Sequence, residues 1–525
     1  MRRTARRATL LFAVTVAVAL ALAPAAGASS SLESIFQDDQ ALVNSSPDFA
    51  RQSLDELRGL GVQSIHSLVV WAQVAPDRGS ATRPAGFDAT DPAAYDRAKW
   101  AKWDTLVREA TARGLGLILT PTLPVPVWAG DCPADPAKAC VNRPSAKEFG
   151  RFVAAVAKRY SGTYPDPDNA GRVLPRVSRW SFLNEPNLGA WLSPQYKKIK
   201  GKVVPVGVKY ERDMIRAGIA AMKANGHASD QFYGADTAPV GDTSRKLATR
   251  KDPPRSFLRS LFCITSRGRK LIDSRIGCTR SFKRLELSGI AHHPYTLGAG
   301  SPPFGRVGSN DITIGTLSRL NGVLKQAAAR GRISKSATRR IYLDEFGFQT
   351  DPPDDTFGVS FNRQAEYINL ADFVAYRTRG VRGLAQYELY DDSAKASFNT
   401  GLRMCNRTAV TDQAGGECLA MLQANDLDPG EAKPSYAAYR LPLYVVRLSA
   451  KRVRVFGWVR PARSAQTVEI RITTGRGEKK KERVVSATTR ANGILDKRVI
   501  RPSGSPRYQL KWNGFTSRTA SVALR

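Results

Sequence analysis

The strongest constraint on the fold is a recurring unit in which an amphipathic helix ends at a glycine and a short apolar strand follows. Phe49 to Arg58 precedes Gly61 and the run 62–71, and later helical patterns are followed in the same way. Glycine fits the left-handed position that ends a helix. Helices that alternate with apolar strands predict a parallel sheet. Eight strands are expected, at 32–43, 62–71, 115–122, 177–184, 231–237, 285–292, 340–345 and 381–388.

Eight alternating units favour a closed (β/α)8 TIM barrel over an open doubly wound sheet. No glycine-rich phosphate loop follows the first expected strand, which argues against nucleotide binding. We therefore expect an α/β barrel domain over residues 29–444. After Leu443 the helical periodicity stops, and short alternating runs separated by turn residues predict a small all-β sandwich over 445–525.

The N-terminus has the pattern of a secretory signal over residues 1–28, with four arginines before an apolar run and Ala26-Gly27-Ala28 as a cleavage site. An uncleaved anchor is the alternative, and no later segment is long enough to span a membrane. Export favours disulfides, and a metal site is the competing use of the cysteines. We expect three local pairs: Cys132 with Cys140, Cys263 with Cys278, and Cys405 with Cys418.

The formal charge is +34, and the excess is concentrated in two regions. Residues 447–525 carry 20 Lys and Arg against four acidic residues, and residues 245–284 carry 13 against two. Such fields attract polyanions, and an exported protein would meet acidic polysaccharides. A generally basic surface is the alternative. No recognition motif supports nucleic-acid binding. In the C-terminal domain we expect the arginines to face the polyanion, among them Arg452, Arg454, Arg460 and Arg463.

Two of the expected strands end in a glutamate. Glu185 follows Trp180-Ser181-Phe182-Leu183-Asn184, and Glu345 follows Ile341-Tyr342-Leu343-Asp344. In a barrel the carboxyl ends of the strands meet on one face, where active sites lie. Two carboxylates that face one substrate are the minimal equipment for breaking a glycosidic bond. Two unrelated surface glutamates are the alternative.

The motifs resemble those of the retaining glycoside hydrolases of clan A, over roughly residues 32–444. Asn184-Glu185-Pro186-Asn187 is similar to their fourth-strand signature, and Asp344-Glu345-Phe346-Gly347 to their seventh-strand nucleophile motif. Pro124 to Ala129 is similar to a pattern of the family 39-like members, and His292-His293-Pro294-Tyr295 falls at the sixth strand. The chain departs from the clan by having no arginine near the end of strand two, where His66 stands, and no tryptophan at the end of strand eight.

The resemblance implies a secreted glycosidase that needs no metal or cofactor. Glu185 would be the general acid and base, and Glu345 the nucleophile. Asn184 would donate to the sugar 2-hydroxyl, and Tyr295 would hydrogen-bond Glu345 and keep it ionised. His292 or His293 would orient polar groups, and only one should face the pocket, because adjacent strand residues point oppositely.

Aromatic side chains near the expected strand ends are candidate platforms for a carbohydrate, although core packing is the competing role for each. A third carboxylate near the mouth would contact substrate or pair with an arginine. A transglycosylase would use the same residues, and a non-catalytic carbohydrate- or envelope-binding protein is the alternative from another class. The additional substrate-binding candidates are Trp71, Trp128, Trp191, Tyr387, Tyr390 and Glu388.

Overall fold

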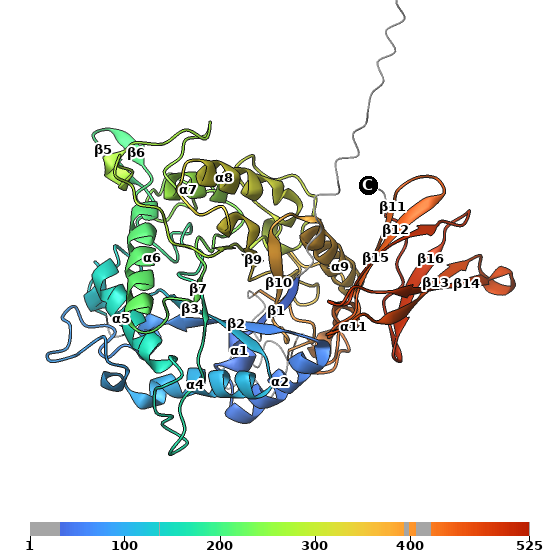
Figure 1. Cartoon of the computed structure of the whole chain (residues 1–525), viewed down its shortest axis with the longest axis horizontal. Helices are drawn as coiled ribbons and strands as arrows, with labels where there is room; N and C mark the ends of the chain where they lie inside the picture. The colour runs from blue at the N-terminus through green and yellow to red at the C-terminus, as the bar shows by residue number, and fades with distance from the viewer. Residues whose placement is uncertain (1–31, 136, 393–397, 406–419, 421, 524–525) are drawn as a thin grey trace, which may run out of the picture.

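The computed structural model describes residues 32–135, 137–392, 398–405, 420 and 422–523. Eight parallel strands form one sheet in the order β7-β4-β3-β2-β1-β10-β9-β8, and helices surround it (Figure 1). The arrangement confirms the predicted barrel. Its strands are β1 (Glu33–Gln37), β2 (Ser64–Val70), β3 (Gly116–Thr122), β4 (Arg179–Trp180), β7 (Gln231–Phe232), β8 (Ile290–Ala291), β9 (Ile341–Leu343) and β10 (Val381–Tyr387).

Backbone hydrogen bonds close the barrel between the two outer strands, β7 and β8. Ser288 N donates to Phe232 O at 2.7 Å, and Ala291 N donates to Gly234 O at 3.1 Å. Beyond the strand ends, His293 N donates to Thr237 O at 3.0 Å. This seam brings the carboxyl ends of all eight strands to one face of the barrel.

The helices lie outside the strands. Each recurring unit of the sequence forms one, and several begin earlier than the apolar pattern alone indicates. Gly61 ends the first long helix with φ +88°, a conformation that favours glycine. The helices with eight or more residues are α2 (Pro47–Leu60), α4 (Arg97–Ala112), α5 (Ala146–Arg159), α6 (Gly207–Ala224), α7 (Pro254–Leu261), α8 (Ser318–Ala329) and α9 (Phe361–Arg377).

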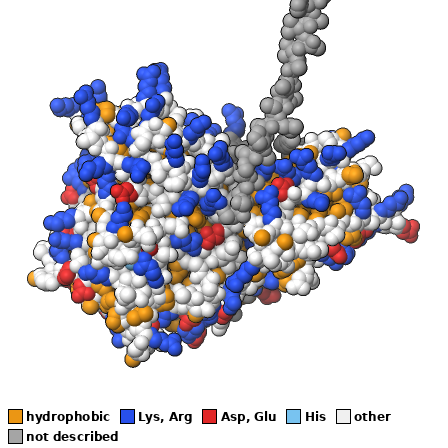
Figure 2. All heavy atoms as spheres, viewed as in Figure 1, with side chains coloured by type: hydrophobic (Ala, Val, Ile, Leu, Met, Phe, Trp, Pro, Cys, Tyr) orange, Lys and Arg blue, Asp and Glu red, His pale blue; other side chains and the backbone are white. Residues whose placement is uncertain are grey.

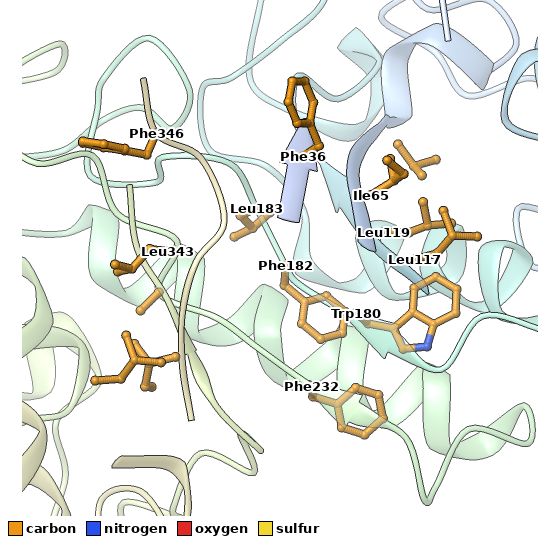
Figure 3. Close-up of a cluster of buried hydrophobic side chains, with 14 of the residues drawn as sticks. Phe36, Ile65, Leu117, Leu119, Trp180, Phe182, Leu183, Phe232, Leu343 and Phe346 are labelled. Atoms are coloured by element: carbon orange, nitrogen blue, oxygen red, sulfur yellow. The ribbon is translucent and has the colours of Figure 1, made fainter. Parts of the chain in front are cut away.

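Alternation along the strands separates two kinds of side chain. Those that face the helices form the large apolar core, including Phe36, Ile65, Trp180 and Phe232 (Figure 3). Alternate positions face the barrel axis, because successive strand residues point to opposite sides. A separate inner cluster is formed by Ile35, Ile118, Tyr233, Ala291, Tyr342 and Ala385.

The first expected strand, 32–43, is too long. The strand stops at Gln37, and α1 (Asp39–Leu42) follows at once. The side chain of Asp38 accepts a hydrogen bond from Ala41 N at 2.8 Å and so caps this helical turn. An aspartate N-cap satisfies a backbone N–H that would otherwise lack a partner, and it ends the strand inside an apolar run.

The C-terminal region is a sandwich of two antiparallel sheets, as predicted. Their facing sides form a second apolar core that includes Val455, Ile470 and Leu510. The first strand begins at Leu443, two residues before the expected boundary. One sheet has the order β11 (Leu443–Arg447), β12 (Arg452–Trp458), β15 (Ile494–Ile500), and the other has β14 (Lys481–Thr488), β13 (Thr467–Thr474), β16 (Arg507–Trp512), β17 (Phe515–Thr516).

The sandwich packs on the barrel through α9, which lies beside it with α11 (Pro434–Arg440) (Figure 1). Phe373 of α9 stacks on Tyr444 with ring centroids 5.4 Å apart, and Tyr376 stacks on Phe456 at 5.3 Å. The two domains therefore share buried aromatic surface. Removal of the sandwich would expose these rings on the barrel.

Arg460 is the polar centre of this interface and corrects the expectation that it faces a polyanion. Its side chain is 2% exposed and lies 2.6 Å from Asp372 of α9. It also donates to Tyr439 O at 2.9 Å and covers the ring of Trp458. Arg454 is largely buried as well and lies 3.1 Å from Asp496.

Two of the three expected disulfides are confirmed, Cys132–Cys140 and Cys263–Cys278. Cys418 and the expected signal segment 1–28 lie outside the described residues, so the third disulfide and the signal stay predictions. Within the described ranges, no helix combines the length and the apolar character needed to cross a membrane.

The interface predicts a large effect for Arg460→Ala. Removal of the guanidinium leaves Asp372 buried without its charge partner, and breaking one side of a buried pair costs about 3–5 kcal/mol. We expect a clear fall in the thermal unfolding midpoint, measured by circular dichroism. Arg463→Ala, at an exposed position three residues away, is the control and should unfold like the wild type. Equal midpoints for Arg460→Ala and wild type would contradict the assignment.

Candidate functional site

The barrel brings Glu185 and Glu345 together across its upper face. Glu185 follows β4 and Glu345 follows β9, and oxygens of the two carboxyl groups lie within 4.8 Å of one another. Their side chains are 15% and 13% exposed. Both glutamates are thus partly exposed but largely shielded from water.

The backbone around Glu185 is strained. Leu183 and Glu185 adopt left-handed conformations with φ +67° and +42°, which L-residues occupy at a cost of order 1–3 kcal/mol each. Hydrogen bonds to neighbouring strand ends hold this turn: Leu183 N donates to Pro121 O, and Glu185 N donates to Asp236 O at 3.0 Å. The barrel therefore fixes the direction of the Glu185 side chain.

Asn184 lies between the two strained residues. Its backbone N–H donates to Thr122 Oγ1 at 2.8 Å. The side chain is 5% exposed, and its carboxamide oxygen has no partner among the described residues. A buried amide oxygen without a donor is costly, so this atom is suited to contact a ligand at the pocket.

Glu345 has one neutral and one charged neighbour. The Tyr295 hydroxyl donates to its Oε1 at 3.1 Å, as expected, and His293 Nδ1 lies 3.8 Å from its Oε2. Burial raises the pKa of Glu345 to about 7, against the lowering effect of His293 and of the Tyr295 hydrogen bond. Tyr295 therefore favours the ionised form without restoring the ordinary pKa of a glutamate.

The two adjacent histidines point in opposite directions, and only His293 faces the glutamates. It follows the inward-facing Ala291 by two positions, and its Nδ1 lies 3.2 Å from Glu185 Oε1. His292 instead contacts Thr237 Oγ1 through Nδ1 at 2.9 Å and donates from Nε2 to Ile312 O at 2.9 Å. The suggested substrate contact for His292 is therefore replaced by a structural role.

A cleft of about 810 Å³ opens beside the glutamates. Its wall includes Glu185 and Tyr295, and three exposed apolar side chains form part of its rim. These rim residues carry no signal in the sequence, because they lie in loops and a short turn without strand or helix periodicity. The apolar rim residues are Leu297, Phe357 and Phe398.

The five predicted aromatic platforms are not among the residues that line this cleft. Trp71 is fully buried and stacks on Phe152 with centroids 5.3 Å apart, so it is core. Trp128 packs edge-on against Trp71, and Tyr390 contacts Phe49 and Glu56 on the barrel exterior.

Trp191 lies in the turn after Leu188, which does line the cleft. Tyr387 is partly buried at the end of β10, and the charge of Glu345 contributes to its raised pKa after burial and Glu388. Tyr387 therefore lies close enough to Glu345 for its charge to be felt, although it does not line the cleft.

Among the described residues, Glu388 neither lines the cleft nor pairs with an arginine. It is 3% exposed, and its Oε2 accepts from Thr400 N at 2.9 Å. Burial raises its pKa well above the usual range, and the charges of Asp392 and Asp38 add to this effect. One carboxylate oxygen therefore turns toward the backbone of the following loop, and the substrate contact stays a prediction.

Two groups of side chains have spacings that a metal ion would require: Glu185, His293 and Glu345, and below them His66, Asp236 and Asp344. Both ring nitrogens of His66 already have partners, Gln37 and Thr120. Both nitrogens of His293 face carboxylates. Each histidine therefore has polar partners for both ring nitrogens without a metal ion.

Several solved structures resemble this chain at low sequence identity. The β-glucuronidase 2 of Bacteroides uniformis is 11% identical over 94% of this chain and 46% of its own, with a TM-score of 0.42. The family 1 β-glucosidase of Thermotoga maritima is 12% identical over 72% and 86%, with a TM-score of 0.40. GH5_18 from Streptomyces cattleya is 13% identical over 78% and 83%, with a TM-score of 0.42.

The chain spans about half the length of the β-glucuronidase chains that it resembles. No protein-family model and no curated protein sequence matches it. Identities this low do not assign an activity.

The raised pKa of Glu345 predicts a pH-dependent effect of Glu345→Gln. A carboxyl whose pKa is about 7 when folded and ordinary when unfolded stabilises the fold at low pH, and loses that contribution as pH rises through 7. Relative to wild type, the glutamine variant should therefore gain roughly 1–3 kcal/mol between about pH 4 and about pH 8. Urea unfolding at several pH values measures the difference.

The exposed Glu478→Gln is the control and should give a difference that does not change with pH. A flat difference for Glu345→Gln as well would show that Glu345 titrates normally.

Proposed function

We propose that this protein is a secreted retaining glycoside hydrolase that cleaves O-glycosidic bonds of an oligo- or polysaccharide. The observation that carries the proposal is the approach of Glu185 and Glu345, whose oxygens lie within 4.8 Å. Retaining enzymes hold their two carboxyl groups about 5–5.5 Å apart, whereas inverting enzymes leave room for a water molecule between them. The separation here suits direct attack by one carboxylate.

In this mechanism Glu345 attacks the anomeric carbon while Glu185 protonates the departing oxygen. Water, activated by Glu185, then hydrolyses the glycosyl-enzyme. Tyr295 supports the ionised form of Glu345 through its 3.1 Å hydrogen bond. Asn184, at the strained turn, presents its side chain to the sugar 2-hydroxyl. His293 orients Glu185.

A transglycosylase would use the same residues with a sugar in place of water. The non-catalytic alternative is less well supported, because both glutamates, Asn184 and Tyr295 are present with mutually consistent geometry. A strained turn that aims a glutamate into a cleft would also have no use in a purely structural barrel.

The basic surface supports an acidic polysaccharide as the polymer on which the enzyme acts. Lys and Arg side chains are spread over both domains on the face shown in Figure 2, with fewer Asp and Glu between them. At the tip of the sandwich, Lys479, Lys480 and Lys481 are all exposed. Export through the expected signal 1–28 would bring this surface into contact with envelope or extracellular polymers.

Alanine variants test the catalytic assignment. Glu345→Ala and Glu185→Ala should each stay folded but lose most turnover of aryl glycosides. Suitable aryl glycosides are first found by screening neutral and acidic sugars. Azide should restore Glu345→Ala with inversion, because the anion takes the place of the nucleophile. It should restore Glu185→Ala with retention on substrates that have good leaving groups.

Product stereochemistry by proton NMR distinguishes the two rescues. Glu478→Ala, remote and exposed, is the control and should match wild type. Full activity in either active-site variant would refute the assignment.

A charge-reversal variant tests the polymer contact without removing the interface to the barrel. Replacing Lys479, Lys480 and Lys481 by glutamate should lower the salt concentration at which the protein elutes from a polyuronate column, since exposed charges are screened within about 8 Å at physiological ionic strength. The same exchange at the exposed barrel residues Lys147, Lys325 and Lys335 is the control. Elution of both variants at the same salt concentration would mean that the sandwich tip contributes no more to polymer binding than the barrel lysines do.

A further inference from the structure

A fully buried polar layer lies directly beneath the carboxylate pair. Asp344 follows the inward-facing Tyr342 by two positions and precedes Glu345. Asp236 lies just past β7, where Ala235 has φ +78° and breaks the alternation of the strand. Asp236, Asp344 and His293 are all 0% exposed. The mechanism described above uses none of the charge on the two aspartates.

His293 connects this layer to the glutamates. Its Nδ1 lies 3.2 Å from Glu185 Oε1, and its Nε2 lies 2.9 Å from Asp236 Oδ1. An ionised carboxylate can only accept hydrogen bonds, and a neutral imidazole carries only one N–H. The Nδ1–Glu185 contact has hydrogen-bond geometry, whereas the Nε2–Asp236 contact is a close charge contact without it. When both partners are ionised, their charges therefore favour a ring that carries both protons.

The other two histidines nearby, His66 and His292, do not have carboxylates at both ring nitrogens. His66 and His292 each direct one nitrogen at a threonine hydroxyl, Thr120 at 2.8 Å and Thr237 at 2.9 Å. A hydroxyl can donate as well as accept, so both rings can stay neutral. Burial lowers the pKa of each to about 4, in agreement with a neutral ring.

The two aspartates also differ from each other. Asp236 Oδ2 accepts from Ser181 Oγ at 3.2 Å, and its Oδ1 faces His293. Neither oxygen of Asp344 has a hydrogen-bond partner among the described residues, and its nearest cation is His293 at 3.8 Å. A buried carboxylate without donors is costly, whereas a protonated one can donate to its neighbour. Asp344 is therefore more readily protonated than Asp236.

We propose that Asp236 and Asp344 are positioning residues that share one proton beneath the site, with Asp236 ionised and Asp344 neutral, and that together they hold His293 doubly protonated between Glu185 and Glu345. No Lys or Arg within the described ranges forms an ion pair with either glutamate or either aspartate. His293 is then the cation that allows two acidic groups to lie close together.

The groups that face His293 are Glu185, Glu345, Asp236 and Asp344, with His66, His292 and Tyr295 around them. Burial alone would lower the pKa of His293, but the charges of Glu345 and Asp236 outweigh it and raise the pKa well above its usual range. Burial and the charge of Asp236 raise the pKa of Asp344 well above its usual range, while His293 keeps that of Asp236 low against the effect of burial.

The catalytic meaning of this layer rests on the proposed function, but its protonation can be measured without a substrate. The chain has only four histidines, so ring nitrogen shifts of ¹⁵N-histidine-labelled full-length protein can be assigned with single His→Gln variants. We expect His293 in the wild type to keep both ring protons from about pH 6 to about pH 8, a range in which a free histidine loses one.

The two aspartate variants should differ. Asp344→Asn keeps a donor toward Asp236 and should leave His293 doubly protonated. Asp236→Asn removes the ionised partner, and His293 should become neutral at pH 7, a change of at least tenfold in the ratio of the two forms. Asp104→Asn is the control, because Asp104 is also buried in an ion pair, but its partners are Arg159 and Tyr160 rather than His293 or the glutamates.

A neutral His293 in the wild type at pH 7 would overturn the proposal, and so would an imidazolium that survives in Asp236→Asn. If Asp236→Asn does not fold, the wild-type titration and Asp344→Asn still decide, since loss of the ring proton in Asp344→Asn contradicts the assigned proton position. Unchanged turnover in the glutamate variants would refute the proposed function alone, because the nitrogen shifts do not depend on it.

Discussion

The seam between β7 and β8 is the contact on which the site depends. Backbone hydrogen bonds from Ser288, Ala291 and His293 to the region of β7 close the sheet there. Residues just beyond the two strands then meet, and this places Asp236 2.9 Å from His293. The same closure sets β4 and β9 on facing sides of the barrel, and so brings together two glutamates 160 positions apart in the chain.

The interior of the barrel is arranged in layers by the alternation of its strands. An apolar ring that includes Ile35, Ile118 and Tyr342 lies in the middle. Two positions further along, the inward residues become polar, and Asp344 and His293 are the continuation of that ring. The glutamates lie one residue beyond or across from these, at the mouth. The apolar ring excludes water from below, which strengthens every electrostatic interaction in the polar layer.

The sandwich is part of the same folded unit rather than a separate tether. Its aromatic residues pack on α9, and Gly61, at the end of α2, lies so close to Arg460 that an added Cβ would be 2.5 Å from it. Arg460 thus reaches the end of one barrel helix and pairs with Asp372 on another. The charge of Arg460 is therefore paired inside the molecule. Only arginines at the exposed edges of the sandwich can contact a polymer.

Much of the architecture could be read from the sequence, because helix and strand periodicities and helix-ending glycines are local signals. They gave the eight units and the change at Leu443, and the closeness of the cysteines in the chain gave the two confirmed disulfides. The strand-end rule also brought Glu185 and Glu345 to attention, and it would have found Asp236 had it been applied to every carboxylate. Tyr295 came from the family resemblance. The predicted end of the first strand was wrong, because a hydrogen bond to the side chain of Asp38 starts a helical turn and ends β1 early.

What only the tertiary structure decided is the environment of each side chain. Trp71 has the aromatic side chain that a sugar platform needs, yet it stacks on Phe152 in the core. Arg460 has the charge of a polyanion contact, yet its partner is Asp372. His292 and His293 are the same residue type at adjacent positions. Closure of the barrel directs His293 to Glu185 and His292 to Ile312. Burial and pairing depend on contacts between distant segments, and no local pattern records these contacts.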